Sequence, residues 1–278
     1  MSTDTRSKVD FDETGAGDAI VLVPGSCSTG AAWRPVVSHL RERYRCITTS
    51  LPGYGDSSER RTSADTSIAR VAEAVEEVIA RAAAPVHLVG HSFGGLVALA
   101  VALRRRAIVK SLTMLEPPAV RLLDDPADTV HALAFRSMSD DYLAAHARGE
   151  PAAISAMIDF YGGDGTFASW PERVRSYAIE TTPVNLVDWK SAFGFPLTSH
   201  GLRALGVPAV VVCGGDSHPA MHRITESLAT AIGRTPPTII ANAAHFMIAT
   251  HAAEVARAID GHIASLSHPL GHHLADRE

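Results

Sequence analysis

The feature that most constrains the fold is a strand-like run that ends in the pattern G-x-S-x-G at Gly90–Gly94. The preceding residues, Val86–Val89, are mostly apolar, and an apolar stretch without helix breakers follows at Leu96–Leu103. This order predicts a strand, a sharp turn and a helix. Glycines on both sides of the turn let the strand and the helix approach closely, so that Ser92 stands above the edge of the sheet.

Strand-like and helix-like stretches alternate along most of the chain. The predicted strands are continuously apolar, which is typical of strands buried on both faces, and Asp65–Ala82 is an amphipathic helix. We therefore expect an α/β fold with a mostly parallel, twisted sheet covered by helices on both faces. Sites in such sheets lie at the carboxyl ends of the strands. The further strands are predicted at Ala19–Val23, Arg45–Leu51, Ile108–Leu115, Val207–Cys213 and Thr238–Ala241.

The alternation stops after Pro118 and resumes with the strand at Val207–Cys213. Only helical patterns occur between them, and this segment holds ten of the sixteen aromatic residues. We predict a helical cap over residues 119–200, inserted into a core formed by residues 1–118 and 201–278. Most of these aromatic side chains should pack the cap onto the core. A few should line an apolar pocket, and Trp170 and Phe193 are the candidates.

Composition limits the classes of partner and the compartment. The net charge of −5 argues against nucleic acid or an anionic membrane as a partner. The three cysteines are too few and too scattered for a disulfide framework, which favours a reducing compartment. The N-terminus lacks an apolar leader, and no apolar run is long enough to span a bilayer. We expect a cytoplasmic protein, a monomer or homodimer, whose partner is a small molecule.

Four motifs occur in an order that resembles a known superfamily. Pro24–Cys27 is similar to a His-Gly-x-x loop, with proline in place of histidine, and Ser50–Ser57 is similar to D-x-P-G-x-G-x-S, with serine in place of the aspartate. Gly90–Gly94 is the nucleophile elbow, and Ala244–Phe246 resembles a G-H-F turn. Over nearly its whole length the chain resembles the α/β-hydrolase superfamily, in the branch of capped esterases, lactonases and carbon–carbon hydrolases.

The residue types indicate nucleophilic catalysis. The Ser92 hydroxyl needs a base, and His245 follows the last predicted strand, from which it can reach the elbow. His218 and His222 have the i,i+4 spacing of metal ligands, but no acidic or cysteine ligand completes a set. No glycine-rich phosphate loop opens a helix, so we expect neither a metal nor a cofactor.

The acid that would orient His245 has two candidates. In the superfamily the acid usually follows the strand that is here Val207–Cys213, but the expected position holds Ser217, and Asp216 comes one residue early. Some branches place the acid at the end of the preceding strand, where this chain has Glu116. An acidic residue between an apolar strand and two prolines is unusual for a surface position, so we favour Glu116 slightly over Asp216.

The resemblance also implies an oxyanion hole made of two backbone N–H groups. One should belong to Phe93, directly after the nucleophile. The other should come from the loop after the first strand, from Ser26 or, as second choice, Cys27.

A serine at the elbow argues against the dehalogenases and epoxide hydrolases of this fold, which use an aspartate. We expect a serine hydrolase that cleaves a small to medium carboxylic ester or lactone through an acyl-enzyme. Two alternatives stay open, a carbon–carbon bond hydrolase of diketone-like substrates and a ligand receptor with little turnover.

Overall fold

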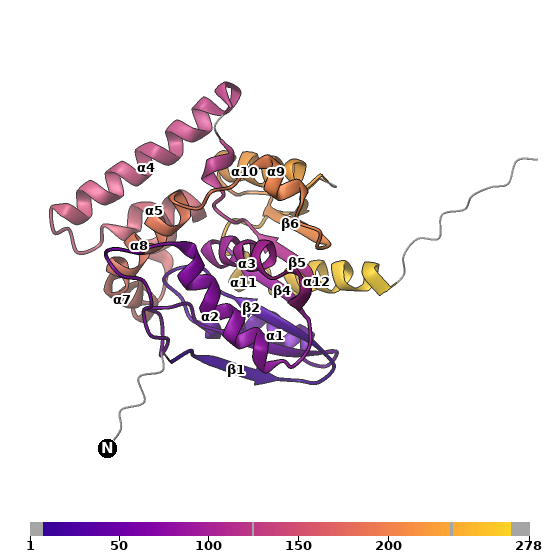
Figure 1. Ribbon diagram of the computed structural model, residues 1–278. Coiled ribbons are helices and arrows are strands. Elements are labelled where there is room, and N and C mark those ends of the chain that lie inside the picture. The colour runs from indigo at the N-terminus through magenta and orange to yellow at the C-terminus, as the bar shows by residue number, and fades with distance from the viewer. Residues whose placement is uncertain (1–7, 124, 234–235, 268–278) are drawn as a thin grey trace, which may run out of the picture.

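The computed structural model describes residues 8–123, 125–233 and 236–267, and in it seven strands form one sheet (Figure 1). The strand order is β1-β3-β2-β4-β5-β6-β7, with β1 antiparallel to β3 and every other pair parallel. This confirms the predicted fold class. The strands are β1 (Phe11–Thr14), β2 (Asp18–Val23), β3 (Tyr44–Thr49), β4 (Val86–His91), β5 (Val109–Leu115), β6 (Ala209–Gly214) and β7 (Thr238–Ile240).

Alternate residues of each central strand enter two separate apolar layers. In β2, Val21 and Val23 pack in the layer that contains helices α2, α3 and α10, whereas Ile20 and Leu22 pack in the layer with α1, α11 and α12. Because side chains alternate across a strand, an unbroken apolar run is what a sheet covered on both faces requires. These helices are α1 (Arg34–Leu40), α2 (Ile68–Arg81), α3 (Phe93–Arg104), α10 (Pro219–Ala231), α11 (Met247–Thr250) and α12 (Ala252–Ser267).

Between β5 and β6 the described residues form helices joined by turns and loops, and in Figure 1 α4, α5, α7 and α8 lie at one side of the molecule whereas α9 lies beside α10. Its aromatic side chains make ring contacts with one another, as between Phe135 and Phe160 at a centroid distance of 5.0 Å. The division of the chain into a core and a cap is a separate matter and stays a prediction. The α-helices here are α4 (Thr129–Ala147), α5 (Ile154–Gly162), α6 (Thr166–Ser169), α7 (Glu172–Glu180), α8 (Thr182–Phe193) and α9 (Ser199–Arg203).

The register of the central strands brings three turns to one edge of the sheet. Val23 pairs with Gly90, and His91 pairs with Leu115, so β2, β4 and β5 end level with one another. The turns that follow these strands therefore lie side by side. This places the residues after Val23, His91 and Leu115 within reach of one another.

The loop after β3 departs from the superfamily motif at Ser50, and a residue near the N-terminus compensates. The Ser50 hydroxyl donates to the Asp10 carboxylate at 2.8 Å and accepts the backbone N–H of Gly30 at 3.1 Å. A carboxylate thus supports this loop, although it comes from another part of the chain.

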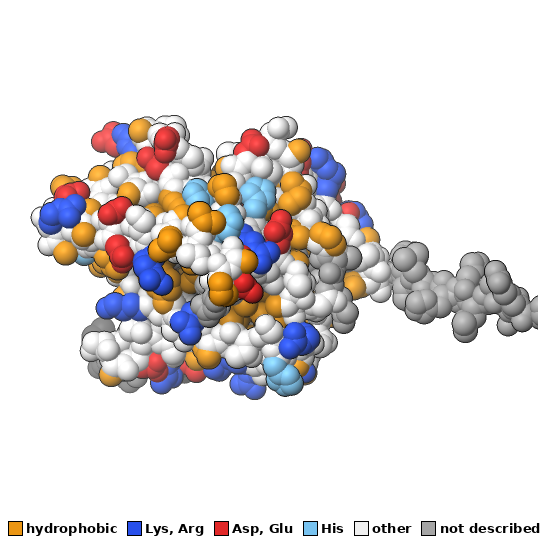
Figure 2. Space-filling view, turned by 90° about the horizontal axis from the view of Figure 1, so that it is seen from above, with side chains coloured by type: hydrophobic (Ala, Val, Ile, Leu, Met, Phe, Trp, Pro, Cys, Tyr) orange, Lys and Arg blue, Asp and Glu red, His pale blue; other side chains and the backbone are white. Residues whose placement is uncertain are grey.

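Acidic and basic side chains are interspersed over the face seen in Figure 2, with hydrophobic side chains between them. Among the described helices, none is both long and apolar enough to cross a membrane.

Candidate active site

Ser92 occupies a strained turn between β4 and α3. Its backbone φ of 53° and ψ of −130° lie where residues with a side chain are rarely found. The flanking glycines are required by close contacts, because a Cβ on Gly90 would meet the Gly94 carbonyl oxygen at 2.3 Å, and one on Gly94 would meet the Pro24 carbonyl oxygen at 2.2 Å. The backbone N–H of Ser92 donates to the carbonyl of Leu115 at 2.8 Å, which ties the elbow to β5.

His245 lies in the loop between β7 and α11 and is buried. Its Nε2 is 2.9 Å from the Ser92 hydroxyl oxygen, and its Nδ1 is 2.7 Å from a carboxylate oxygen of Glu116. The carboxylate can only accept, so Nδ1 carries the proton and Nε2 is free to accept the Ser92 O–H. His91 donates from Nε2 to the His245 carbonyl at 2.7 Å, which fixes the histidine loop on the elbow.

Glu116 follows β5 and is completely buried. Its second oxygen accepts the backbone N–H of Gly214 at 2.7 Å and the Ser217 hydroxyl at 2.5 Å. Burial by itself would raise the pKa of Glu116. The hydrogen bond and the charge of His245 outweigh burial, together with the hydrogen bonds from Ser217 and Gly214. They lower that pKa below its ordinary value. Glu116 is therefore a carboxylate that holds the imidazole in one tautomer.

The other candidate acid, Asp216, does not reach His245. Its side chain is exposed, and its backbone N–H donates to the Ala243 carbonyl at 2.8 Å. The next residue, Ser217, turns inward and contacts Glu116. The serine at the usual acid position thus supports an acid supplied by the neighbouring strand.

Backbone strain is concentrated around this cluster. Of the five non-glycine residues with positive φ in the described part of the chain, Ser92, Glu116 and Cys27 belong to the site, with φ of 53°, 45° and 57°. Each such residue costs of order 1–3 kcal/mol, and such residues persist only where the surrounding structure holds them. Three of them in one place indicate a site whose geometry is imposed by packing.

The loop after β2 runs directly beside Ser92. A Cβ added to Gly25 would lie 2.9 Å from the Cβ of Ser92, so only glycine fits here. Ser26 and Cys27 follow in the wall of the same cavity as Ser92 and Phe93. The N–H of Phe93 belongs to the first turn of α3, where backbone donors have no partner within the helix.

Burial and the nearby charge of Asp188 raise the pKa of the Cys27 thiol to about 12, so this cysteine stays protonated.

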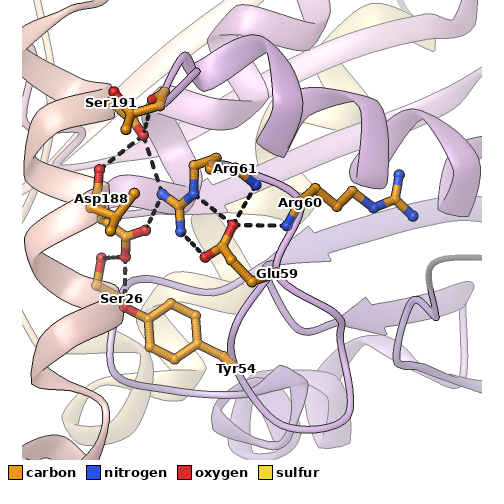
Figure 3. A network of polar contacts seen from close by, with 9 residues as sticks. Ser26, Tyr54, Glu59, Arg60, Arg61, Asp188 and Ser191 are labelled. Carbon is orange, nitrogen blue, oxygen red and sulfur yellow. Dashed lines mark hydrogen bonds and ion pairs between the residues drawn. The ribbon is translucent and has the colours of Figure 1, made fainter. Parts of the chain in front are cut away.

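A buried ionic network holds the loop after β2 against α8 (Figure 3). The carboxylate of Asp188 accepts from the Ser26 hydroxyl at 2.5 Å, the Tyr54 hydroxyl at 2.6 Å and the Arg61 guanidinium at 2.6 Å. Arg61 is also paired with Glu59 at 2.7 Å. Burial raises the pKa of Asp188, while the charge of Arg61 and the two hydroxyl groups oppose that change. A buried carboxylate with three donors depends on all of them for its stability, because loss of one partner leaves a polar group unpaired.

Removing the Ser26 hydroxyl should impair turnover more than stability. We expect Ser26→Ala to lower kcat roughly 10-fold, because the loop that carries the Ser26 N–H loses its anchor, whereas loss of an oxyanion donor itself costs ~10²–10³-fold. The matched control is Ser191→Ala, since Ser191 accepts from Arg61 at 3.2 Å in the same network but does not line the cavity. Ester hydrolysis and thermal unfolding of both variants test this. An equal loss of kcat in the two variants would contradict it.

Ser92 and His245 open on a cavity of about 400 Å³. Trp170, one of the two aromatic candidates from the cap segment, is in its wall. Phe193 is not among the residues that line it: α8 ends at this residue, whose side chain is 41% exposed and whose ring centroid lies 5.3 Å from that of Trp189. The wall is mainly apolar, and its larger side chains are Phe93, Met157, Ile158, Tyr161, Trp170, Val174, Asn185, Asp188, Trp189, Phe246 and Ile248.

His218 and His222 contact neighbouring side chains and the start of α10. The ring of His218 stacks on Phe160 at 4.0 Å, and its Nδ1 accepts the N–H of Ala220 at the start of α10. His222 lies 3.6 Å from the Cys213 sulfur. Among the described residues, no three His, Cys, Asp or Glu side chains are grouped so as to hold a metal ion.

Sequence reasoning missed Asp188, Arg61 and Tyr161. Tyr161 stacks on the His245 ring at a centroid distance of 4.3 Å. A carboxylate inside a helix with apolar neighbours was the one available signal for Asp188, since charged residues are seldom fully buried unless they are paired. Its partner Ser26 is 162 positions away in the sequence, so the pairing itself had no local pattern.

Comparison with known proteins supports the same assignment of fold. A sequence family described as "Alpha/beta hydrolase family" matches residues 20–258. Among solved structures, an esterase from Thermogutta terrifontis superimposes with a TM-score of 0.74 at 22% identity, covering 95% of this chain and 96% of its own. The enol-lactonase from Burkholderia xenovorans superimposes with a TM-score of 0.71 at 17% identity, covering 94% and 98%. At these identities the likeness concerns the fold.

Curated relatives are similar over part of their length. The pimeloyl-[acyl-carrier protein] methyl ester esterase of Methylococcus capsulatus is 38% identical over 105 residues, which is 38% of this chain and 39% of that protein. The (E)-2-((N-methylformamido)methylene)succinate hydrolase of Acinetobacter baylyi is 30% identical over 106 residues, 38% of this chain and 40% of that protein. The chain thus matches about two fifths of the length of these relatives.

Proposed function

Because this chain belongs to the alpha/beta hydrolase family, we propose that it is a serine hydrolase that cleaves a small to medium carboxylic ester or lactone through an acyl-enzyme. The observation that carries the proposal is the continuous hydrogen-bonded series from Ser92 through His245 to the buried Glu116, open to an apolar cavity at the serine end. The esterase among the partial relatives and the likeness to an esterase and an enol-lactonase in fold support the same class.

The mechanism follows from the positions of the three side chains. His245 Nε2 accepts the proton of Ser92 as the hydroxyl oxygen bonds to the acyl carbon. Glu116 stabilises the imidazolium that forms. The backbone N–H groups of Phe93 and Ser26 stabilise the negative charge on the carbonyl oxygen. His245 returns the proton to the departing alkoxide, and water then cleaves the acyl-enzyme by the same sequence of proton transfers.

In this proposal the helical segment over residues 119–200 acts as a cap that selects the substrate. Met157 and Trp170 belong to it, and both are in the cavity wall. A cavity of this volume, with an apolar wall, suits an acyl or alcohol part of modest size.

The test is hydrolysis of p-nitrophenyl esters from acetate to octanoate. We expect turnover with an initial burst of nitrophenol, because an activated ester acylates Ser92 faster than water cleaves the acyl-enzyme. Absence of turnover across the series, together with no labelling of Ser92 by a sulfonyl fluoride, would overturn the proposal. Labelling without turnover would instead favour a receptor on this fold.

The same series of esters should show which aromatic side chains of the segment contact the substrate. We expect Trp170→Ala to change the ratio of octanoate to acetate kcat/KM roughly 10-fold, because a large side chain leaves the wall of the cavity. Phe193→Ala is the matched aromatic control, and the ratio should stay within about twofold since this side chain lies outside the cavity. A uniform fall for all chain lengths in Trp170→Ala would mark Trp170 as a packing residue.

A further inference from the structure

The cavity contains a tyrosine hydroxyl without a protein partner. Tyr161, on α5, is only 6% exposed and lines the cavity, with its ring stacked on His245 at an interplanar angle of 28°. Within the described part of the chain, its hydroxyl makes no hydrogen bond. Burial raises the pKa of Tyr161 well above the ordinary value for a phenol, so the group keeps its proton and remains a donor.

A second unmatched donor lies on α8. Asn185 is 2% exposed and also lines the cavity. Its side-chain carbonyl accepts the hydroxyl of the buried Tyr142 at 2.8 Å, which fixes the amide in one orientation. The amide nitrogen then has no partner among the residues that the structure describes. Asn185 therefore holds a rigid N–H donor in the wall of the cavity.

The other strongly polar side chains in the wall are already engaged. Ser26 and Asp188 bind each other, and Ser92 and His245 belong to the hydrogen-bonded series that ends at Glu116. The Ser28 hydroxyl donates to the Gly25 carbonyl at 3.1 Å. Among the described residues, Tyr161 and Asn185 are thus two buried members of the wall that hold a donor without a protein partner.

When a ligand displaces water from an apolar cavity, the donors in its wall are left unpaired at a cost unless the ligand supplies an acceptor. We propose that the substrate carries a second carbonyl oxygen within a few bonds of the scissile ester, and that the Tyr161 hydroxyl and the Asn185 amide bind it. The two carbonyl groups of the substrate must be close together because the Tyr161 ring contacts His245, which places the phenol beside the reacting group. The substrate class is an oxo-ester or oxo-lactone, and this inference rests on the proposed function.

The two residues determine specificity in this proposal, and they do so by different means. Tyr161 also covers one face of the His245 ring, a role that phenylalanine can keep. Tyr161→Phe therefore removes the donor while it preserves the stacking. Asn185→Leu removes the amide at similar volume, and the rate on a substrate without the second carbonyl reports whether that variant is still folded.

The experiment compares methyl 3-oxohexanoate with methyl hexanoate in wild type, Tyr161→Phe and Asn185→Leu. The measured quantity is the ratio of their kcat/KM values. The intrinsic reactivity of the oxo-ester contributes equally to every ratio, so it cancels when variants are compared. We expect the ratio to fall roughly 10-fold in each variant, because only the oxo-ester loses a hydrogen bond. Val174→Ala, an apolar change in the same wall, should alter both rates by the same factor.

Two failures can be told apart. Turnover of both esters with a ratio that stays within twofold in Tyr161→Phe and Asn185→Leu would overturn this inference alone, and would mean that water satisfies the two donors. Absence of turnover of both methyl esters and of the p-nitrophenyl series by wild type, with no labelling of Ser92, would overturn the proposed function, and this inference with it.

Discussion

Replacement of Ser92 by alanine is expected to lower kcat for p-nitrophenyl acetate by about 10⁴-fold or more. The hydroxyl is the atom that bonds to the acyl carbon in the proposed mechanism, and no other side chain within 2.9 Å of His245 Nε2 is a nucleophile among the described residues. The residual rate should reflect only binding and the oxyanion donors.

The folded state should survive this change. Ser92→Ala loses one hydrogen bond to His245, worth about 1 kcal/mol, and the strained backbone of the elbow is unaltered. We expect near-wild-type circular dichroism and a small shift in Tm. The matched control is Ser38→Ala, since the Ser38 hydroxyl is exposed and binds only the Pro35 carbonyl. A Ser92→Ala variant with most of its esterase rate would show that the elbow is not the nucleophile.

Glu116→Gln is expected to lower kcat by about 10³- to 10⁴-fold. A neutral amide cannot stabilise the imidazolium, and it does not fix the tautomer in which Nε2 accepts the serine proton. The buried surroundings increase the effect, because Gly214 and Ser217 are arranged around a carboxylate oxygen. Steady-state hydrolysis of the short esters measures it, with thermal unfolding to check that the variant is folded.

Asp216→Asn is the matched control for this substitution. This substitution makes the same change from carboxylate to amide on an exposed side chain. Asp216 is 100 positions after Glu116 and follows β6, which pairs with β5. We expect kcat within twofold of wild type. A larger loss in Asp216→Asn than in Glu116→Gln would mean that the acid follows β6, as in the commoner arrangement of the superfamily.

Much of the fold could be predicted from short stretches of sequence. Ala19–Val23 and Val207–Cys213 lie within two residues of the observed β2 and β6, and the helix predicted at Asp65–Ala82 contains α2. These elements depend on local hydrophobic periodicity and on breakers such as Pro24-Gly25. The elbow was predictable from its local pattern as well, since Gly90 is required by a contact with Gly94, four positions along the chain.

The acid shows where such reasoning ends. Glu116 and Asp216 both follow strands that pair in parallel, with Leu115 opposite Val212, so both reach the same edge of the sheet. The order of the strands therefore could not decide which of the two carboxylates contacts His245. The difference is the direction of each side chain: the buried carboxylate of Glu116 contacts His245, whereas the side chain of Asp216 is exposed.

The sequence by itself determined the parallel sheet, the turn that presents Ser92 and the loop that carries His245, because each depends on sterics and periodicity within a few residues. Tertiary structure alone decided that Glu116 contacts His245, that Asp188 anchors Ser26, and that Trp170 but not Phe193 lines the cavity. The physical reason is that these contacts join residues scores of positions apart, so they are set by how whole helices and strands pack and not by any local pattern.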